Sequence, residues 1–171
     1  MATVDLTEAM RAMPVPIKVI RYRRITSKDW VPAIDLQVYV NSRDPNDVYI
    51  SAQSACVVLG LNRRWLSVAE GRASTMERLA SCGFSDQKTM LNVTVENSPT
   101  GLAKPSRGLT QADFDALMEY AASIGKKPAL ILRNAFFAFG LVTIAGLSTP
   151  ETRRECFRVC LEQSRRELEA G

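Results

Sequence analysis

One segment near the C-terminus restricts the possible folds more than any other, because it is apolar on nearly every side. Residues 129–145 follow Pro128, which favours the first turn of a helix since its missing N–H is not needed there. A helix with apolar side chains all round must be covered by other elements. The longest apolar run, 135–147, is shorter than the roughly 18 to 20 residues that cross a bilayer. The segment therefore predicts a buried central helix and no membrane partner.

Helix start and stop signals lie on both sides of this segment. Residues 110–113 read T-Q-A-D, which has the spacing of a capping box with Asp in place of the usual Glu, and Gly125 is placed to end the helix that follows. The sequence T-P-E at 149–151 combines a capping residue, a proline for the first turn and an early acid. These signals predict a three-helix bundle over residues 109–171.

The N-terminal part shows the period-two pattern of strands. Ile34, Leu36, Val38 and Val40 alternate with polar or aromatic residues, which puts the aliphatic side chains on one face. The strands that we predict span 15–25, 34–40, 48–50 and 89–96, and the helices span 51–59 and 63–80. The predicted fold is therefore α+β, with a small antiparallel sheet, a helix-turn-helix-like helix pair and the C-terminal three-helix bundle.

Composition divides the chain into three predicted regions. Residues 1–96 contain the sheet and the helix pair, 97–108 form a linker rich in Pro, Gly and Ser, and 109–171 form the bundle. Residues 1–108 hold 14 Lys and Arg against 10 Asp and Glu, a net charge of +4, whereas 109–171 hold 8 of each. The excess positive charge of the N-terminal part suits an anionic partner.

The chain contains no histidine, which excludes catalytic triads and zinc sites that depend on an imidazole. The first ten residues, MATVDLTEAM, lack the basic start of a secretory signal, so we expect a cytoplasmic protein with reduced thiols. The four cysteines, at 56, 82, 156 and 160, have no C-x-x-C spacing and fit core packing better than metal binding. We predict no catalytic residue, no cofactor and no metal.

The segment from Tyr49 to Leu66 reads Y-I-S-A-Q-S-A-C-V-V-L-G-L-N-R-R-W-L and predicts two helices with a sharp turn at Gly60. This arrangement exposes the start of the second helix, where DNA-binding helix-turn-helix proteins contact bases and phosphates. The predicted DNA-binding residues lie there, with auxiliary phosphate contacts from the basic strand: Asn62, Arg63, Arg64, Trp65, Arg21, Arg23 and Arg24. The alternative interpretations are a plain packing corner and a solvated sheet edge.

A β-hairpin that leads into Y-I-S-A-Q-S-A-C-V-V-L-G-L resembles the entry of phage antirepressor N-terminal and KilA-N-type domains. Those domains place a short strand before a helix of small residues that ends in L-G. The resemblance covers about residues 30–96 and implies binding to double-stranded DNA, as in a phage- or plasmid-type transcriptional regulator or antirepressor. The three C-terminal helices have no counterpart in it.

Two other functions stay open from the sequence. A Mg²⁺-dependent endonuclease of the restriction type needs clustered acids, for which Asp35, Asp44 and Asp47 are the candidates, although Gln37 stands where such sites carry lysine. A protein–protein interaction module is the other alternative. Phe136, Phe137 and Phe139 point in at least two directions of one helix, which favours a homodimer that covers one of them.

Overall fold

Five short strands close into a barrel in this computed structural model, which describes residues 21–26, 34–85, 87–94, 102–146, 149 and 151–171. The strands are β1 Arg21–Thr26, β2 Gln37–Asn41, β3 Val48–Ser51, β4 Thr89–Thr94 and β5 Lys104–Leu109. Their order around the barrel is β1-β2-β3-β5-β4. All the pairs are antiparallel except β1 with β4, which is parallel and closes the barrel.

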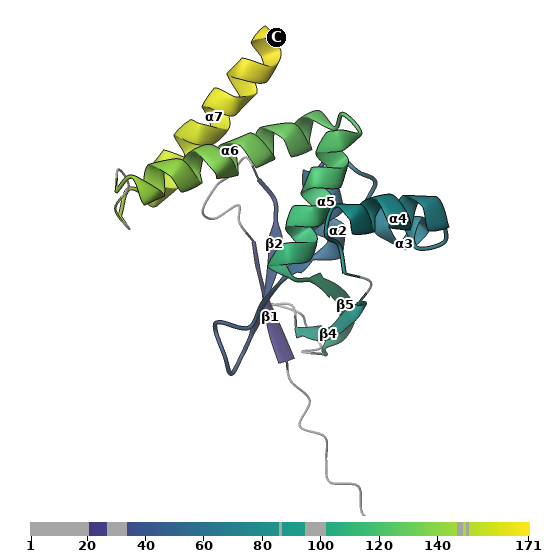
Figure 1. Ribbon diagram of the computed structural model, residues 1–171. Coiled ribbons are helices and arrows are strands. Elements are labelled where there is room, and N and C mark those ends of the chain that lie inside the picture. The colour runs from purple at the N-terminus through teal and green to yellow at the C-terminus, as the bar shows by residue number, and fades with distance from the viewer. Residues whose placement is uncertain (1–20, 27–33, 86, 95–101, 147–148, 150) are drawn as a thin grey trace, which may run out of the picture.

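The helices cover one end and one side of the barrel (Figure 1). They are α2 Ala52–Val58, α3 Trp65–Ala69, α4 Ala73–Ser81, α5 Gln111–Ser123, α6 Lys127–Ile144 and α7 Arg153–Ala170. Helix α5 lies between the barrel and α6, and α7 packs along α6 (Figure 1). The predicted α+β class, with helices at the C-terminus, is confirmed. Among the described residues, no helix combines the length and the hydropathy that a membrane span requires.

Capping and turn residues explain where α2 and α5 begin and end. The Ser51 hydroxyl accepts a hydrogen bond from the Ser54 amide, and the Thr110 hydroxyl accepts one from the Asp113 amide. Gly60 and Gly125 have φ of 76° and 78°, which other residues rarely adopt. The predicted helix starts at 51 and 110 and the predicted turns at these glycines are confirmed.

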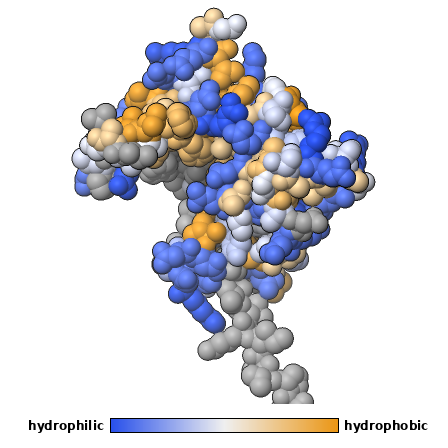
Figure 2. Space-filling view, viewed as in Figure 1, coloured by the Kyte–Doolittle hydropathy of each residue, from blue (hydrophilic) through white to orange (hydrophobic). Residues whose placement is uncertain are grey.

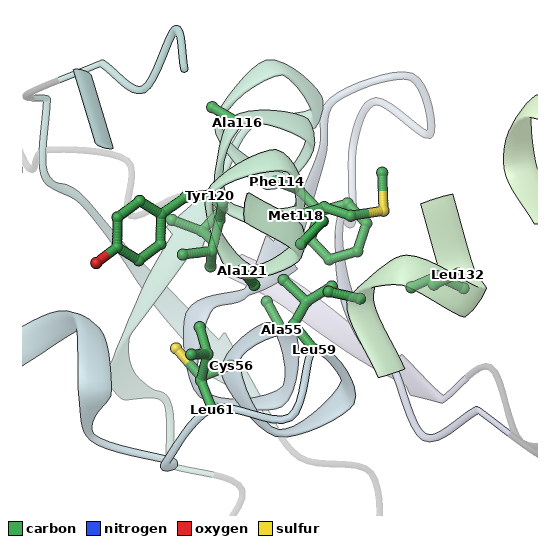
Figure 3. Close-up of a cluster of buried hydrophobic side chains, with 14 of the residues drawn as sticks. Ala55, Cys56, Leu59, Leu61, Phe114, Ala116, Met118, Tyr120, Ala121 and Leu132 are labelled. Carbon is green, nitrogen blue, oxygen red and sulfur yellow. The ribbon is translucent and has the colours of Figure 1, made fainter. Parts of the chain in front are cut away.

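A single buried cluster connects the N-terminal helices to the C-terminal ones. Figure 3 shows Cys56, Leu59 and Leu61 of the α2 region facing Ala121 of α5 and Leu132 of α6. The same cluster extends to α7. The C-terminal helices therefore share a core with the rest of the chain, and the predicted division at residues 97–108 does not separate two cores.

The predicted linker is wrong over its second half, because Lys104–Leu109 form β5 between β3 and β4. Gly108 lies at a close approach: a Cβ atom there would stand 2.7 Å from Leu91 Cδ1 and 2.9 Å from Tyr49 Cβ. The glycine therefore allows dense packing against the inner face of the barrel, where Tyr39, Leu91 and Val93 form a small buried cluster. Residues 97–101 lie outside the described part of the chain.

The single helix predicted over 63–80 is also wrong, because α3 and α4 are separate helices. The break spans Glu70 to Arg72, and Arg72 is extended, with φ −125° and ψ 97°. Gly71 weakens a helix at this point, and the change of direction carries Leu79 into the core, where it is fully buried. The strand predicted over 15–25 is described from Arg21 onward, and residues 15–20 lie outside the described part.

All four cysteines are free thiols. Cys56 and Cys160 are buried in the main cluster, and the half-buried Cys82 and Cys156 pack against it. Burial raises the pKa of the Cys56 thiol, and the nearby Arg107 lowers it by a smaller amount. The prediction that the cysteines serve core packing is confirmed for these positions.

Candidate nucleic-acid interface

A tight corner joins α2 to α3 and fixes the position of the predicted DNA-binding residues. Gly60 turns the chain, and the Leu61 amide donates to the Cys56 carbonyl at 2.8 Å. Leu61 and Leu66 are both buried, so they anchor the corner to the core on each side of the exposed residues between them. We call the exposed segment Asn62, Arg63 and Arg64 the basic corner.

The sequence predicts that the basic corner forms the first turn of a helix. This prediction is wrong, because the corner is a turn that precedes the helix. Asn62 Oδ1 accepts a hydrogen bond from the Arg64 amide at 2.9 Å, and the Asn62 carbonyl accepts one from the Trp65 amide at 2.8 Å. These two bonds satisfy Asn62 locally, which is typical of a short polar side chain in a turn. Helix α3 begins only at Trp65. Asn62, Arg63 and Arg64 are all exposed.

A hydrogen bond to the preceding helix orients the first arginine. Arg63 Nε donates to Gln53 Oε1 at 2.9 Å, which holds the guanidinium beside α2. Arg63 lines two hollows, one of about 250 Å³ toward β4 and β5 and one of about 190 Å³ toward the start of β2. Among the described residues, neither Arg63 nor Arg64 forms an ion pair with a carboxylate. Their charge is therefore available to an external anion.

Trp65 lies on the other side of the corner and packs inward. Its ring centroid is 5.1 Å from that of Tyr120 on α5, and Arg78 of α4 lies 5.5 Å above the same tyrosine ring. The half-buried tryptophan thus connects α3 to α5 and attaches the basic corner to the main buried cluster. The sequence predicts Trp65 on the DNA-reading edge, and the structure places it beside the basic corner with its ring packed against α5.

The end of the basic strand β1 lies close to the basic corner. Thr26, the last residue of β1, donates to Asp35 at 3.1 Å, and Asp35 lines the smaller hollow with Arg63. The Gln37 amide at the start of β2 donates to Ser54 Oγ on α2 at 3.0 Å, which fixes the barrel to the helix pair. Arg24 is exposed on β1, opposite Tyr39 of β2.

The side chains of Arg21 and Arg23 lie outside the described part of the structure, although both residues belong to β1. Both pair with β4 in the parallel pair that closes the barrel, and Arg23 also pairs with β2 in the antiparallel pair. The structure thus brings the predicted basic strand and the predicted corner to neighbouring positions, and it places one of the three strand arginines, Arg24, at the surface.

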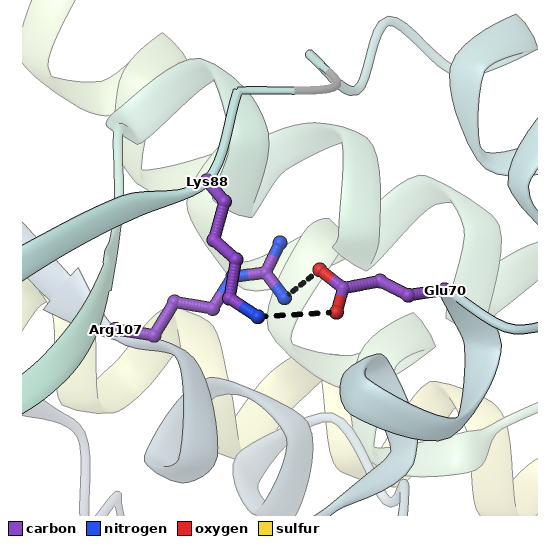
Figure 4. A network of polar contacts seen from close by, with 3 residues as sticks. All are labelled: Glu70, Lys88 and Arg107. Carbon is purple, nitrogen blue, oxygen red and sulfur yellow. Dashed lines mark hydrogen bonds and ion pairs between the residues drawn. The ribbon is translucent and has the colours of Figure 1, made fainter.

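Two cations that the sequence did not single out join Arg63 around the larger hollow. Lys88 stands one residue before β4, and Arg107 lies on β5. Both pair with Glu70, which follows α3: Lys88 Nζ lies 3.5 Å from Glu70 Oε2, and Arg107 Nη1 pairs with Glu70 Oε1 (Figure 4). The three residues come from segments far apart in the sequence, and Arg107 lay in the predicted linker, so local patterns gave no signal for this network.

The acids considered for a nuclease do not converge. Asp35 stands before the start of β2, while Asp44 and Asp47 occupy the turn after its end, and a five-residue strand is roughly 17 Å long. In that turn, Asp47 accepts from Asn41 Nδ2 at 2.8 Å and Asp44 accepts from the Asn46 amide at 2.9 Å. Across the described residues, no group of three potential metal ligands comes together.

Helices α6 and α7 carry an exposed apolar face. Phe136 and Phe139 contact Phe157 of α7, with ring centroids 5.1 and 5.4 Å away. Phe137 points away from that contact and is 71% exposed. Leu141 and Val159 are also at least half exposed, and Figure 2 shows apolar side chains gathered over α6 and beside α7.

Comparison of the chain with protein-family models, with curated proteins and with solved structures finds no match.

Proposed function

We propose that this chain binds double-stranded DNA through the basic corner, as a phage- or plasmid-type transcriptional regulator or antirepressor. One observation carries the proposal. Arg63 and Arg64 are adjacent and exposed, the turn that holds them is fixed by Asn62 and Gln53, and no carboxylate among the described residues neutralises either one. Two adjacent exposed guanidinium groups, of which Arg63 is held by Gln53, suit the phosphates of a duplex.

The geometry favours contacts with the DNA backbone over base reading by α3. This helix has five residues, and its first side chain, Trp65, packs against Tyr120. A recognition helix needs several exposed side chains near its N-terminus to reach base edges in the major groove. We therefore expect the guanidinium groups of the basic corner to supply most of the affinity, with Arg24 of β1 as an auxiliary contact.

The exposed apolar face of α6 and α7 supports a second element of the proposal, a homodimer. Phe137, Leu141 and Val159 leave apolar surface exposed that a second copy would cover. Two-fold pairs are the commonest assembly, and a dimer presents two basic corners to one duplex. A sedimentation experiment that finds only monomer at micromolar concentration contradicts this element and leaves the basic corner unaffected.

Fluorescence anisotropy with a labelled mixed-sequence duplex tests the proposal. The Arg63→Ala, Arg64→Ala double variant should lose at least tenfold in affinity at about 50 mM salt, because two phosphate contacts are removed. A matched double variant, Arg165→Ala, Arg166→Ala, removes two neighbouring arginines near the end of α7 and should bind like the wild type. Equal affinity of all three proteins contradicts the proposal.

The same titration with Mg²⁺ and then with EDTA tests the nuclease alternative. We expect an intact duplex under both conditions. Cleavage that requires Mg²⁺ and is lost in the Asp35→Asn variant contradicts the non-enzymatic assignment.

A further inference from the structure

We propose that the larger hollow beside the basic corner binds a phosphoryl group. We call this hollow, of about 250 Å³, the cationic pocket; Arg63, Lys88 and Arg107 line it together with polar groups such as Ser67 and Ser106. Drug-sized ligands occupy pockets of roughly 300 to 1,000 Å³. A hollow of this size with three cations therefore suits a small anionic group and not a large apolar ligand.

The sheet holds two of the three cations close together. Met90 of β4 is paired with Arg107 of β5, and Lys88 precedes Met90 by two residues. Lys88, just before the start of β4, therefore lies diagonally from Arg107, and diagonal neighbours on paired strands are about 7 to 8 Å apart at the backbone. Both side chains reach the carboxylate of Glu70, so their charged ends also lie near each other, and an anion between them offsets their mutual repulsion.

In this structure the carboxylate of Glu70 provides that anion. It pairs with both Arg107 and Lys88, and Figure 4 shows it reaching between them from the turn after α3. The described residues that line the pocket include three cations and no carboxylate, and Glu70 pairs with two of those cations from outside the lining. Arg63 adds charge that Glu70 does not balance.

Arg107 keeps a further donor without a partner. Its side chain is 12% exposed, and its Nε atom is buried and makes no hydrogen bond within the described part of the chain. Buried donors are almost always paired in folded proteins, so this atom calls for an acceptor. A phosphoryl group presents three acceptor oxygens and more negative charge than a carboxylate, so it can engage Arg107 through two donors and also reach Lys88.

Glu70 is consequently a competitor for the cations that a phosphoryl group would use. It stands at the end of α3, and its side chain is 29% exposed, so the carboxylate can turn toward solvent when another anion enters. The effect of a Glu70 substitution on anion affinity therefore distinguishes a competitor from a carboxylate that only stabilises the fold. Removal of the Glu70 charge should strengthen anion binding, whereas removal of a cation should weaken it.

The phosphoryl group has two possible sources, which experiment separates. It can belong to the backbone of a duplex held at the basic corner, in which case the pocket rests on the proposed function. It can also be a free phosphate or a phosphate monoester, in which case the pocket functions independently of DNA.

The test titrates inorganic phosphate at constant ionic strength and pH, with chloride as the balancing salt, and follows the phosphate resonance by ³¹P NMR. The proteins are the wild type, Lys88→Gln, Glu70→Gln and the control Arg166→Gln, each checked for its fold by circular dichroism. A free-phosphate site predicts wild-type binding that weakens about tenfold in Lys88→Gln, strengthens severalfold in Glu70→Gln and is unchanged in the control.

A duplex titration of the same four proteins covers the other source. A backbone site predicts that inorganic phosphate alone gives no binding, but that duplex affinity falls about tenfold in Lys88→Gln and rises in Glu70→Gln. Phosphate binding without any duplex binding supports the pocket and overturns the proposed function. The pocket proposal is overturned if Lys88→Gln changes neither affinity, or if a folded Glu70→Gln weakens both.

Discussion

Substitution of Gly108 by alanine should destabilise the barrel, because no space exists for one added methyl group. The new Cβ atom would stand 2.7 Å from Leu91 Cδ1 and 2.9 Å from Tyr49 Cβ, both shorter than real Cβ contacts. The leucine methyl can rotate, but the tyrosine Cβ is attached directly to the backbone of β3 and moves only with the strand. Overpacking of this kind costs about 1 to 3 kcal/mol.

A gain in the unfolded state partly offsets that cost. Alanine restricts the unfolded chain more than glycine does, which contributes about 0.4 to 1 kcal/mol of stability. The net loss in the free energy of unfolding should therefore be centred at about 1.3 kcal/mol, equivalent to a decrease of roughly 3 to 5 °C in Tm for a chain of this length.

Gly140→Ala is the matched control. Apart from its chain neighbours and the backbone of its own helix, no described atom lies within 4 Å of the position that its Cβ would occupy, and Gly140 stands inside α6. Alanine should therefore raise the free energy of unfolding by about 0.5 to 1 kcal/mol. Urea denaturation followed by circular dichroism, at one protein concentration, measures both variants. A Gly108→Ala midpoint at or above that of the wild type refutes the close approach of β3 and β4 to β5.

Three further changes follow from the described contacts. Phe137→Ser should convert a dimer to a monomer in analytical ultracentrifugation and leave the far-UV circular dichroism spectrum unchanged, because the ring is 71% exposed in the monomer; an unaltered mass argues against this dimer face. Asp113→Ala should cost about 2 to 3 kcal/mol in urea denaturation, since the buried carboxylate accepts from the Ser85 amide and hydroxyl at 2.8 and 3.1 Å; a loss below about 0.5 kcal/mol contradicts that role. Burial raises the pKa of the Cys56 thiol, so the unfolded chain loses this proton first, and stability that is fully present at neutral pH should decline as pH rises past the ordinary thiol pKa of 9.0; Cys56→Ala should flatten this decline in urea midpoints measured from pH 7 to pH 10, and identical slopes would count against it.

Local signals in the sequence located most of the elements. The hydroxyl caps at Ser51 and Thr110 and the positive-φ glycines at 60 and 125 each act within a few residues, so their chemistry is readable without tertiary structure. The period-two alternation found β2 for the same reason. These features explain why the α+β class and the packing corner at Gly60 were predictable.

Features that depend on distant pairing escaped prediction. The strand Lys104–Leu109 contains Pro105 and Gly108 and lacks clear alternation, because its place is set by β3 and β4 and by the close packing of Gly108. The predicted second helix is divided at Glu70–Arg72, and this break allows Leu79 of α4 to be fully buried in the core, a contact with residues distant in the sequence.

In the candidate site, too, features set by neighbouring residues were predictable and features set by distant contacts were not. The exposure of Arg63 and Arg64 follows from a local turn and was predictable, although their placement in that turn ahead of α3 was not. Trp65 packs against α5, a helix distant in the sequence, and Lys88 and Arg107 come near each other only when β4 pairs with β5 and both side chains reach Glu70. Convergence of this kind requires the three-dimensional structure.

The salt dependence of duplex binding tests the central claim most directly. Each lost phosphate contact should reduce the slope of log K against log salt by about one, so the Arg63→Ala, Arg64→Ala variant should have a slope about two smaller than the wild type between about 50 and 300 mM salt. The Arg165→Ala, Arg166→Ala control should keep the wild-type slope. A double variant at the basic corner with the wild-type slope and affinity contradicts the account, because the two arginines then contact no DNA phosphate.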